Sequence, residues 1–215
     1  MVSSMLLQDL REKGVRKSLS IVPEPDVLEV VEAALEGTNV LSKRTLVVAQ
    51  SDRMIKSFLF KDSVFWVAHR YGAMSADIEK ARQAGQVIVC SWHQAFAIAV
   101  RLSLPLRCSN DLHVEPAPTE MAGLDHLIVT ELPSTSQFHA IVSTLGLLAI
   151  DSVLDIFISR SVLYKSGLAQ MPKKDGGESD DSDTEELGSF LRDVLELVFG
   201  SEIPYAEIHA LVMTT

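Results

Sequence analysis

Apolar residues recur along the chain either in short continuous runs, which are typical of buried strands, or at helical spacing. The two patterns alternate, which predicts strands and helices in succession. Short apolar runs typical of buried strands occupy residues 18–22, 44–49, 64–68 and 87–90. Helical spacing of apolar residues covers residues 27–35 and 92–102. Ser75 is a candidate N-cap for a further helix that ends at Gly85, whereas residues 50–60 fit either a short helix or a long excursion. Strands separated by crossover helices need a sheet covered by helices, so the pattern predicts an α/β fold.

A similar succession of elements follows a polar stretch that contains Pro116 and Pro118 and has no periodicity. Strands are predicted at residues 126–132, 147–150, 154–158 and 203–205, with helices at 133–144 and 189–199. The repetition predicts two domains. Their boundaries are an N-terminal extension (1–16), a first repeat (17–106), a linker (107–124) and a second repeat (125–215) with an acidic insertion (168–187).

Three segments of the first repeat carry a family resemblance. They are Val64–Ala68 (VFWVA), Ala81–Gly85 (ARQAG) and Ile88–Trp92 (IVCSW). Together with the order of elements, they resemble the BRCT domain, and two copies resemble a tandem BRCT unit. The resemblance implies two BRCT-like repeats, each a four-stranded parallel sheet flanked by three helices. It also implies a non-catalytic scaffold for protein interactions in the nucleus, in DNA repair, checkpoint signalling or chromosome segregation at the kinetochore.

Composition and charge limit the partners of this chain. The 215 residues carry a formal net charge of −10, which argues against direct nucleic-acid binding because Lys and Arg drive contacts to phosphate. Much of the acidity lies in residues 178–186 (ESDDSDTEE), a solvated insertion with Ser179 and Ser182 as candidate phosphorylation sites. No apolar run reaches the roughly 18 residues that a membrane span needs. We therefore expect that the partner is another protein and that the chain makes no membrane contact; the nuclear location is implied by the resemblance.

The resemblance also implies where phosphate would bind, because phosphopeptide-binding members use a Ser or Thr after the first strand and a Lys at the second helix. The candidates in this chain are Ser75, Arg70 and Lys80 in the first repeat, and Ser134, Thr135, Ser136 and Lys165 in the second. The first repeat departs from the family pattern, because Pro23-Glu24-Pro25 supplies no hydroxyl and Asp77 places an acid near the expected Lys. For the second repeat, capping of a helix by the three hydroxyls is the competing interpretation.

Catalytic chemistry finds little support in the sequence. Neither HExxH, GxGxxG, GxxxxGK[ST] nor GxSxG occurs, so no cofactor, metal or catalytic residue is predicted. Cys90 lies in an apolar strand, where a reduced core cysteine is expected rather than a nucleophile. The alternative to a scaffold is a small α/β nucleotide-binding protein or enzyme, although the phosphate-binding loop of such proteins is missing.

Overall fold

The structure is a computed structural model that describes residues 11–14, 16–22, 27–37, 44–49, 52–68, 75–104, 123–130, 143–159 and 196. Its elements follow one another as β1 (Lys17–Val22), α2 (Val27–Gly37), β2 (Thr45–Ala49), α3 (Asp52–Phe58), the 3-10 helix η1 (Leu59–Lys61), β3 (Phe65–Val67), α4 (Ser75–Gln83), β4 (Val87–Ser91), α5 (Trp92–Ser103), β5 (Leu124–Val129) and β6 (Leu148–Ser159). The predicted α/β class is confirmed.

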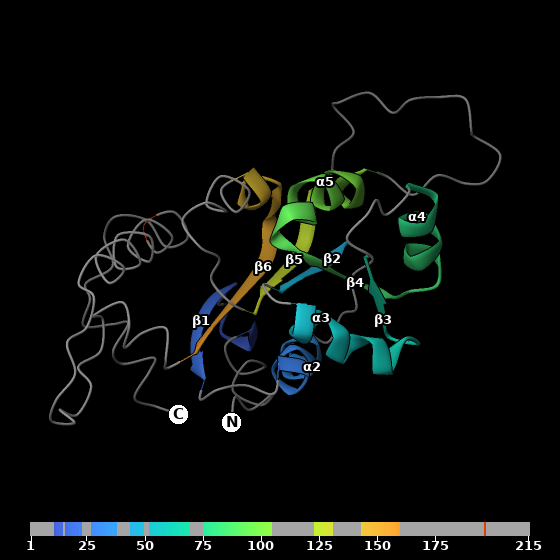
Figure 1. The fold of residues 1–215 in the computed structure, drawn as a ribbon. Helices are drawn as coiled ribbons and strands as arrows, with labels where there is room; N and C mark the ends of the chain where they lie inside the picture. Colours follow the sequence, from blue (N-terminus) through green and yellow to red (C-terminus); the bar gives the residue numbers. More distant parts are fainter. Residues whose placement is uncertain are drawn as a thin grey trace, which may run out of the picture.

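All six strands belong to one parallel sheet in the order β1-β6-β5-β2-β4-β3 (Figure 1). Strand β2 lies inside the sheet, with β4 on one side and β5 on the other. Because parallel neighbours need crossover connections, the helices between the strands lie against the two faces of the sheet.

The expectation of two separate four-stranded sheets is wrong for the residues that the structure describes. β5 comes from the predicted second repeat, yet it pairs with β2, and β6 pairs with β1. Two strands from the second half therefore separate β1 from β2. Hydrophobic periodicity locates strands and their covering helices, but it holds no information on which strands pair, so a repeated order of elements does not establish two sheets.

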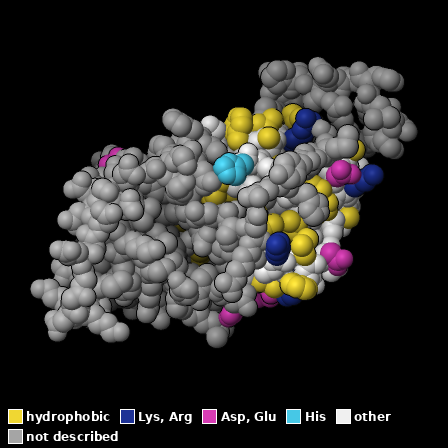
Figure 2. Space-filling model, in the orientation of Figure 1, with side chains coloured by type: hydrophobic (Ala, Val, Ile, Leu, Met, Phe, Trp, Pro, Cys, Tyr) yellow, Lys and Arg dark blue, Asp and Glu magenta, His cyan; other side chains and the backbone are white. Residues whose placement is uncertain are grey.

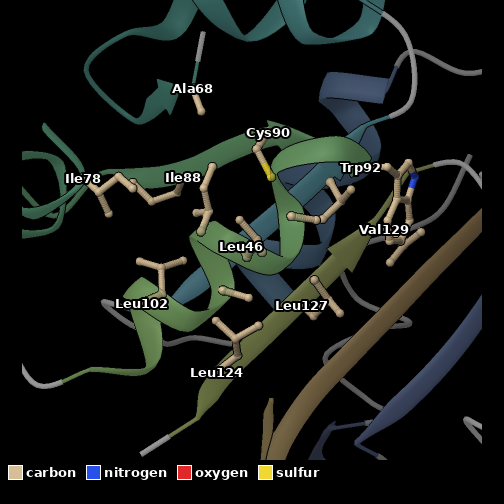
Figure 3. Close-up of a cluster of buried hydrophobic side chains, with 14 of the residues drawn as sticks. Leu46, Ala68, Ile78, Ile88, Cys90, Trp92, Leu102, Leu124, Leu127 and Val129 are labelled. Carbon is tan, nitrogen blue, oxygen red and sulfur yellow. The ribbon is translucent and has the colours of Figure 1, made fainter. Parts of the chain in front are cut away.

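Two hydrophobic cores lie on opposite faces of the sheet, because successive side chains of a strand point to opposite faces. Leu46 and Val48 of β2 join the core under α4 and α5, whereas Val47 joins the core under α2 and α3. Figure 3 shows the first of these cores, in which Trp92 of α5 lies beside Val129 of β5. Leu46, Ile88 and Leu127 of three neighbouring strands belong to the same core. Each such Leu or Ile contributes about 1.5–3 kcal/mol when fully buried.

Helix α5 shows how the sequence dictates this packing. Its buried residues recur at helical spacing and cover the sheet; they are Trp92, Ala95, Ile98, Ala99, Leu102 and Ser103. Phe96 and Arg101 occupy the opposite, exposed side. The Ser103 hydroxyl donates to the carbonyl of Ala99 at 2.8 Å, which satisfies a buried polar group inside the helix.

Several predicted element boundaries are confirmed, and others need correction. The predicted helix end at Gly85 is confirmed, and its φ of 75° is a conformation that favours glycine. The ambiguous stretch 50–60 contains α3 and the start of η1. The predicted strands 147–150 and 154–158 form a single strand, β6, whose register with β5 shifts between Leu124 and His126.

Part of the predicted organisation lies outside the described residues. This applies to the acidic insertion 168–187, to the strand at 203–205, and to nearly all of the linker 107–124 and the helices at 133–144 and 189–199. The C-terminal end of the predicted linker belongs to β5, which begins at Leu124.

Candidate functional site

The carboxyl ends of all six strands lie at one edge of the sheet because every pair is parallel. The chain leaves β2 through α3, on the face of the second core, and leaves β4 through α5, on the face of the first core. Neighbouring strands whose connections diverge to opposite faces form a topological switch point, where open α/β sheets bind their ligands. We call the carboxyl ends of β2, β4 and β5 the switch-point edge.

Two hydroxyl residues mark the switch-point edge. The backbone N–H and the hydroxyl of Thr130 both donate to the carbonyl of Val48, at 3.0 and 3.1 Å, and so fix the end of β5 to β2. Ser91 occupies the N-cap position of α5, but its side chain makes no capping hydrogen bond and lies 3.5 Å from the side-chain oxygen of Gln94. The sheet thus holds the start of α5 beside the end of β2.

The electrostatics at this edge favour an anion. Helix α5 has 12 residues and no acidic residue in its first turn. The partial positive charge at a helix N-terminus attracts negative groups, and an acid in the first turn would compete with them. Helix α4 differs in this respect, because Asp77 lies in its first turn.

The predicted phosphate-binding residues are only partly placed. Ser75 is the first residue of α4, which follows β3, and Lys80 is exposed on the same helix. Arg70, Ser134, Thr135, Ser136 and Lys165 lie outside the described residues. Ser134, Thr135 and Ser136 follow β5 in the chain, and β5 is three strands away from β3 in the sheet. At about 4.8 Å between neighbouring strands, the distance between β3 and β5 is roughly 14 Å. The two predicted half-sites therefore follow different strands of one carboxyl edge.

A buried ionic cluster, which the sequence did not lead us to predict, lies on the face of α2 and α3. Asp155 of β6 accepts hydrogen bonds from Arg11 and from the hydroxyl of Ser18, and His126 Nε2 lies 2.9 Å from its second oxygen. Asp155 is 0 % exposed and the side chains of Arg11 and His126 are 8 % and 3 % exposed. An acid within the apolar run of residues 153–158 was the sequence signal for this cluster.

The protonation state of Asp155 follows from its neighbours. Burial alone would raise the pKa of Asp155, but the hydrogen bond and charge of His126, the charge of Arg11 and the Ser18 hydroxyl together hold that pKa below its usual value. An ionised carboxylate can only accept hydrogen bonds, so in the hydrogen bond between His126 and Asp155 the proton is on Nε2 of His126. Nδ1 of His126 has no hydrogen-bond partner within the described part of the chain.

This cluster stabilises the fold and is distant from the switch-point edge. Ser18 lies near the start of β1 and His126 near the start of β5, whereas the switch-point edge is formed by strand ends. Because Arg11 precedes β1, its ion pair attaches part of the predicted N-terminal extension to the sheet.

A second buried cation lies near the amino ends of the strands. Arg82 of α4 donates to the carbonyl of Leu104, at the end of α5, at 3.1 Å, and lies 3.4 Å from Glu79. Its side chain is 3 % exposed, and this burial lowers its pKa. The contact between α4 and the carbonyl of Leu104, the C-cap residue of α5, holds the two helices together on one face.

Other chemistry is limited within the described ranges. They contain no group of three or more His, Cys, Asp or Glu residues that could hold a metal ion. Burial raises the pKa of the Cys90 thiol, which disfavours the reactive thiolate form. A membrane-crossing helix, sufficiently long and apolar, is likewise absent from these ranges.

Comparison with known proteins yields weak structural likenesses. Neither a family model nor a curated protein matches the sequence. The helicase domain of Hef from Pyrococcus furiosus aligns with 86 % of this chain at 13 % identity and a TM-score of 0.47. The lysine/ornithine decarboxylase of Vibrio vulnificus, complexed with putrescine, aligns with 74 % of it at 12 % identity and a TM-score of 0.24. The chain spans 35 % and 49 % of those two proteins, and neither likeness carries an argument about function.

Proposed function

We propose that this chain is a non-catalytic interaction domain that binds a phosphorylated segment of a partner protein at the switch-point edge. The observation that carries the proposal is the divergence of α3 and α5 to opposite faces beside β2. This arrangement places the start of α5, which has no acid in its first turn, at the position where α/β sheets bind ligands. A phosphate group suits this position because it is a dianion near neutral pH.

The resemblance to BRCT supplies the biological setting of the proposal. It implies a nuclear protein in DNA repair, checkpoint signalling or chromosome segregation, with a protein partner rather than DNA or RNA. The two halves of the chain contribute strands to one sheet: residues 17–106 supply β1 to β4, and the later residues supply β5 and β6. The ligand would then contact strand ends from both halves, because β2 lies between β4 and β5.

A second candidate function is nucleotide binding. A single parallel sheet with a switch point is the arrangement in which dinucleotides and flavins bind, and this observation favours the candidate. The sequence lacks the glycine-rich loops that normally hold the phosphates of those ligands. We therefore rank a phosphopeptide above a nucleotide.

One variant is expected to weaken anion binding at the switch-point edge without disturbing the fold. Ser91→Asp places a carboxylate at the N-cap of α5, where Asp is a favourable cap, so the fold is preserved while an anion is repelled. Ser75→Asp makes the same change at the start of α4 and serves as the matched control. The probes are a phosphoserine peptide library, the same library without phosphate, ATP, ADP and inorganic phosphate.

Binding is measured by thermal shift and by titration calorimetry at two salt concentrations. We expect binding of phosphorylated peptides that weakens as salt rises, is lost in Ser91→Asp and persists in Ser75→Asp. At a ligand concentration of 100 times Kd, the protein gains about 2.7 kcal/mol of stability. Stabilisation by nucleotides alone supports the second candidate, and stabilisation by no probe refutes both.

A further inference from the structure

The members of the buried cluster around Asp155 differ in how firmly the fold holds them. Asp155 lies on β6, which pairs with β1 and β5, and His126 lies on β5, which pairs with β6 and β2 (Figure 1). Arg11 instead precedes β1, the strand at this border of the sheet. The two residues that follow it, Glu12 and Lys13, are exposed. Arg11 is therefore the member of the cluster that can leave without breaking the pairing of β5 and β6.

The charge of the cluster depends on His126. Imidazole in ordinary surroundings changes its charge between about pH 5 and 8. Asp155 stays ionised over this range because its neighbours hold its pKa below the usual carboxyl value. While His126 is neutral, the charges of Arg11 and Asp155 cancel. Protonation of His126 would leave a surplus positive charge in a buried place, and such a charge is strongly unfavourable.

Protonation would also create a donor that the cluster does not satisfy. Nε2 of His126 already carries the proton of the hydrogen bond to Asp155, so an added proton goes to Nδ1. Nδ1 is buried and has no hydrogen-bond partner among the residues that the structure describes. A buried donor without an acceptor loses its hydration and gains nothing in return, so the protonated cluster is under pressure to open.

We propose that the Asp155 cluster is a pH-sensitive latch, in which protonation of His126 weakens the ion pair between Arg11 and Asp155 and releases the segment before β1. Departure of Arg11 removes the second cation and admits water to the new donor at Nδ1. His126 keeps its hydrogen bond to Asp155 and replaces Arg11 as the charged partner of the carboxylate. Residues 11–14 are therefore attached to the sheet at neutral pH and detached in acid.

The remaining charged groups around the cluster are exposed or paired elsewhere. Asp125, next to His126 on β5, points to the opposite face of the sheet and pairs with Arg44. Glu32 of α2 pairs with Lys61. Exposed charged residues on the adjoining elements are Glu12, Lys13, Arg16, Lys17, Glu29, Glu36 and Lys56. Figure 2 shows charged side chains of both signs scattered over the visible surface of the described residues. Water and salt screen such charges, so their titration acts weakly on the buried cluster.

The first test compares the effect of losing Arg11 at two pH values. Arg11→Met keeps an unbranched side chain without the charge, and its effect on the folding equilibrium constant is measured by urea unfolding. The measurements are made at about pH 7.5 and about pH 5.5, near the two ends of the range in which imidazole titrates. We expect the effect to be at least about fivefold smaller at the lower pH, because the ion pair is already weakened there.

Two variants assign this pH dependence to His126. His126→Gln keeps an amide donor for Asp155 but takes up no proton, so in this background Arg11→Met should have the same effect at both pH values. His93→Gln is the matched control, because His93 is exposed on α5, and it should leave the pH dependence unchanged. Circular dichroism at both pH values shows whether each variant is folded.

The second test observes the release itself. The steady-state NOE of the Glu12 and Lys13 amide nitrogens reports backbone motion on the picosecond to nanosecond timescale. We expect values of ordered backbone at the higher pH and of mobile chain at the lower pH, and ordered values at both in His126→Gln. Arg11→Met should be mobile at both, which keeps the test decisive even if His126→Gln does not fold.

The latch does not depend on the phosphate site, so Ser91→Asp should respond to pH as the unchanged chain does. Three results would each overturn the proposal. They are ordered Glu12 and Lys13 amides in the unchanged chain at the lower pH, an effect of Arg11→Met that is equal at the two pH values, and a pH dependence that persists in folded His126→Gln.

Discussion

Replacing Asp155 by Asn tests whether the buried ionic cluster stabilises the fold. Asn keeps the size of the side chain and one acceptor oxygen, but it removes the charge that faces Arg11 and His126. The side chain of Arg11 is 8 % exposed, so its charge would remain buried without its carboxylate partner. Loss of one member of a buried ion pair typically costs about 3–5 kcal/mol. Because domains of this size are stable by about 5–15 kcal/mol, the change would remove a large share of the total.

A matched substitution gives the scale for an exposed pair. Asp125→Asn breaks the ion pair between Asp125, whose side chain is 33 % exposed, and Arg44, whose side chain is 26 % exposed. We expect this change to lower the free energy of unfolding by at most about 1 kcal/mol. Both costs are measured by urea unfolding followed by circular dichroism, with Arg11→Met and the double variant completing a thermodynamic cycle. A coupling between Arg11 and Asp155 should appear as non-additive costs. Equal costs for Asp155→Asn and Asp125→Asn would refute the reasoning.

Three further predictions follow from the same contacts. The pKa of Asp155 is lower in the folded than in the unfolded chain, so its full contribution to the free energy of unfolding is present above the unfolded carboxyl pKa of about 3.9 and is lost as pH falls through the lower folded pKa. The free energy of unfolding should therefore fall less steeply with acid in Asp155→Asn than in the unchanged chain. Identical acid profiles would contradict this. Arg82→Met should lower the free energy of unfolding by about 2 kcal/mol, because the Leu104 carbonyl loses a charged donor; a change below about 0.5 kcal/mol in urea unfolding would contradict it. In a Cys108→Ser background, Cys90 should react with a thiol reagent only at the rate of unfolding, and immediate labelling of the folded protein would contradict its burial.

The local elements could be predicted from the sequence because their signals are local. The apolar spacing of α5, the run of β4 and the glycine that ends α4 are all confirmed within one or two residues. The pairing of β5 with β2 could not be predicted, because it joins segments about 80 residues apart and leaves no periodic trace in either. The sheet order therefore corrected the expectation of two separate sheets, whereas the α/β class was correct.

The candidate site shows the same limit. The resemblance predicts Ser75 and Lys80 as phosphate-binding candidates, and the structure places them on α4, which follows the border strand β3. The switch-point edge depends instead on which strands are neighbours, so local sequence patterns do not point to Ser91 and Thr130. Asp155 had a visible signal, a carboxylate in a buried strand, but its partners Arg11 and His126 are remote in sequence.

The central claim is that both halves of the chain form one sheet, and the hydrogen bond from the N–H of Thr130 to the carbonyl of Val48 tests it most directly. Scalar coupling across this bond, between the Thr130 nitrogen and the Val48 carbonyl carbon, can be measured by NMR on isotopically labelled protein. We predict a coupling similar to that of the bond from Val87 to Val64, which lies within one half. A coupling for Val87 but none for Thr130, with rapid exchange of the Thr130 amide, would contradict the single sheet and the switch-point edge that depends on it.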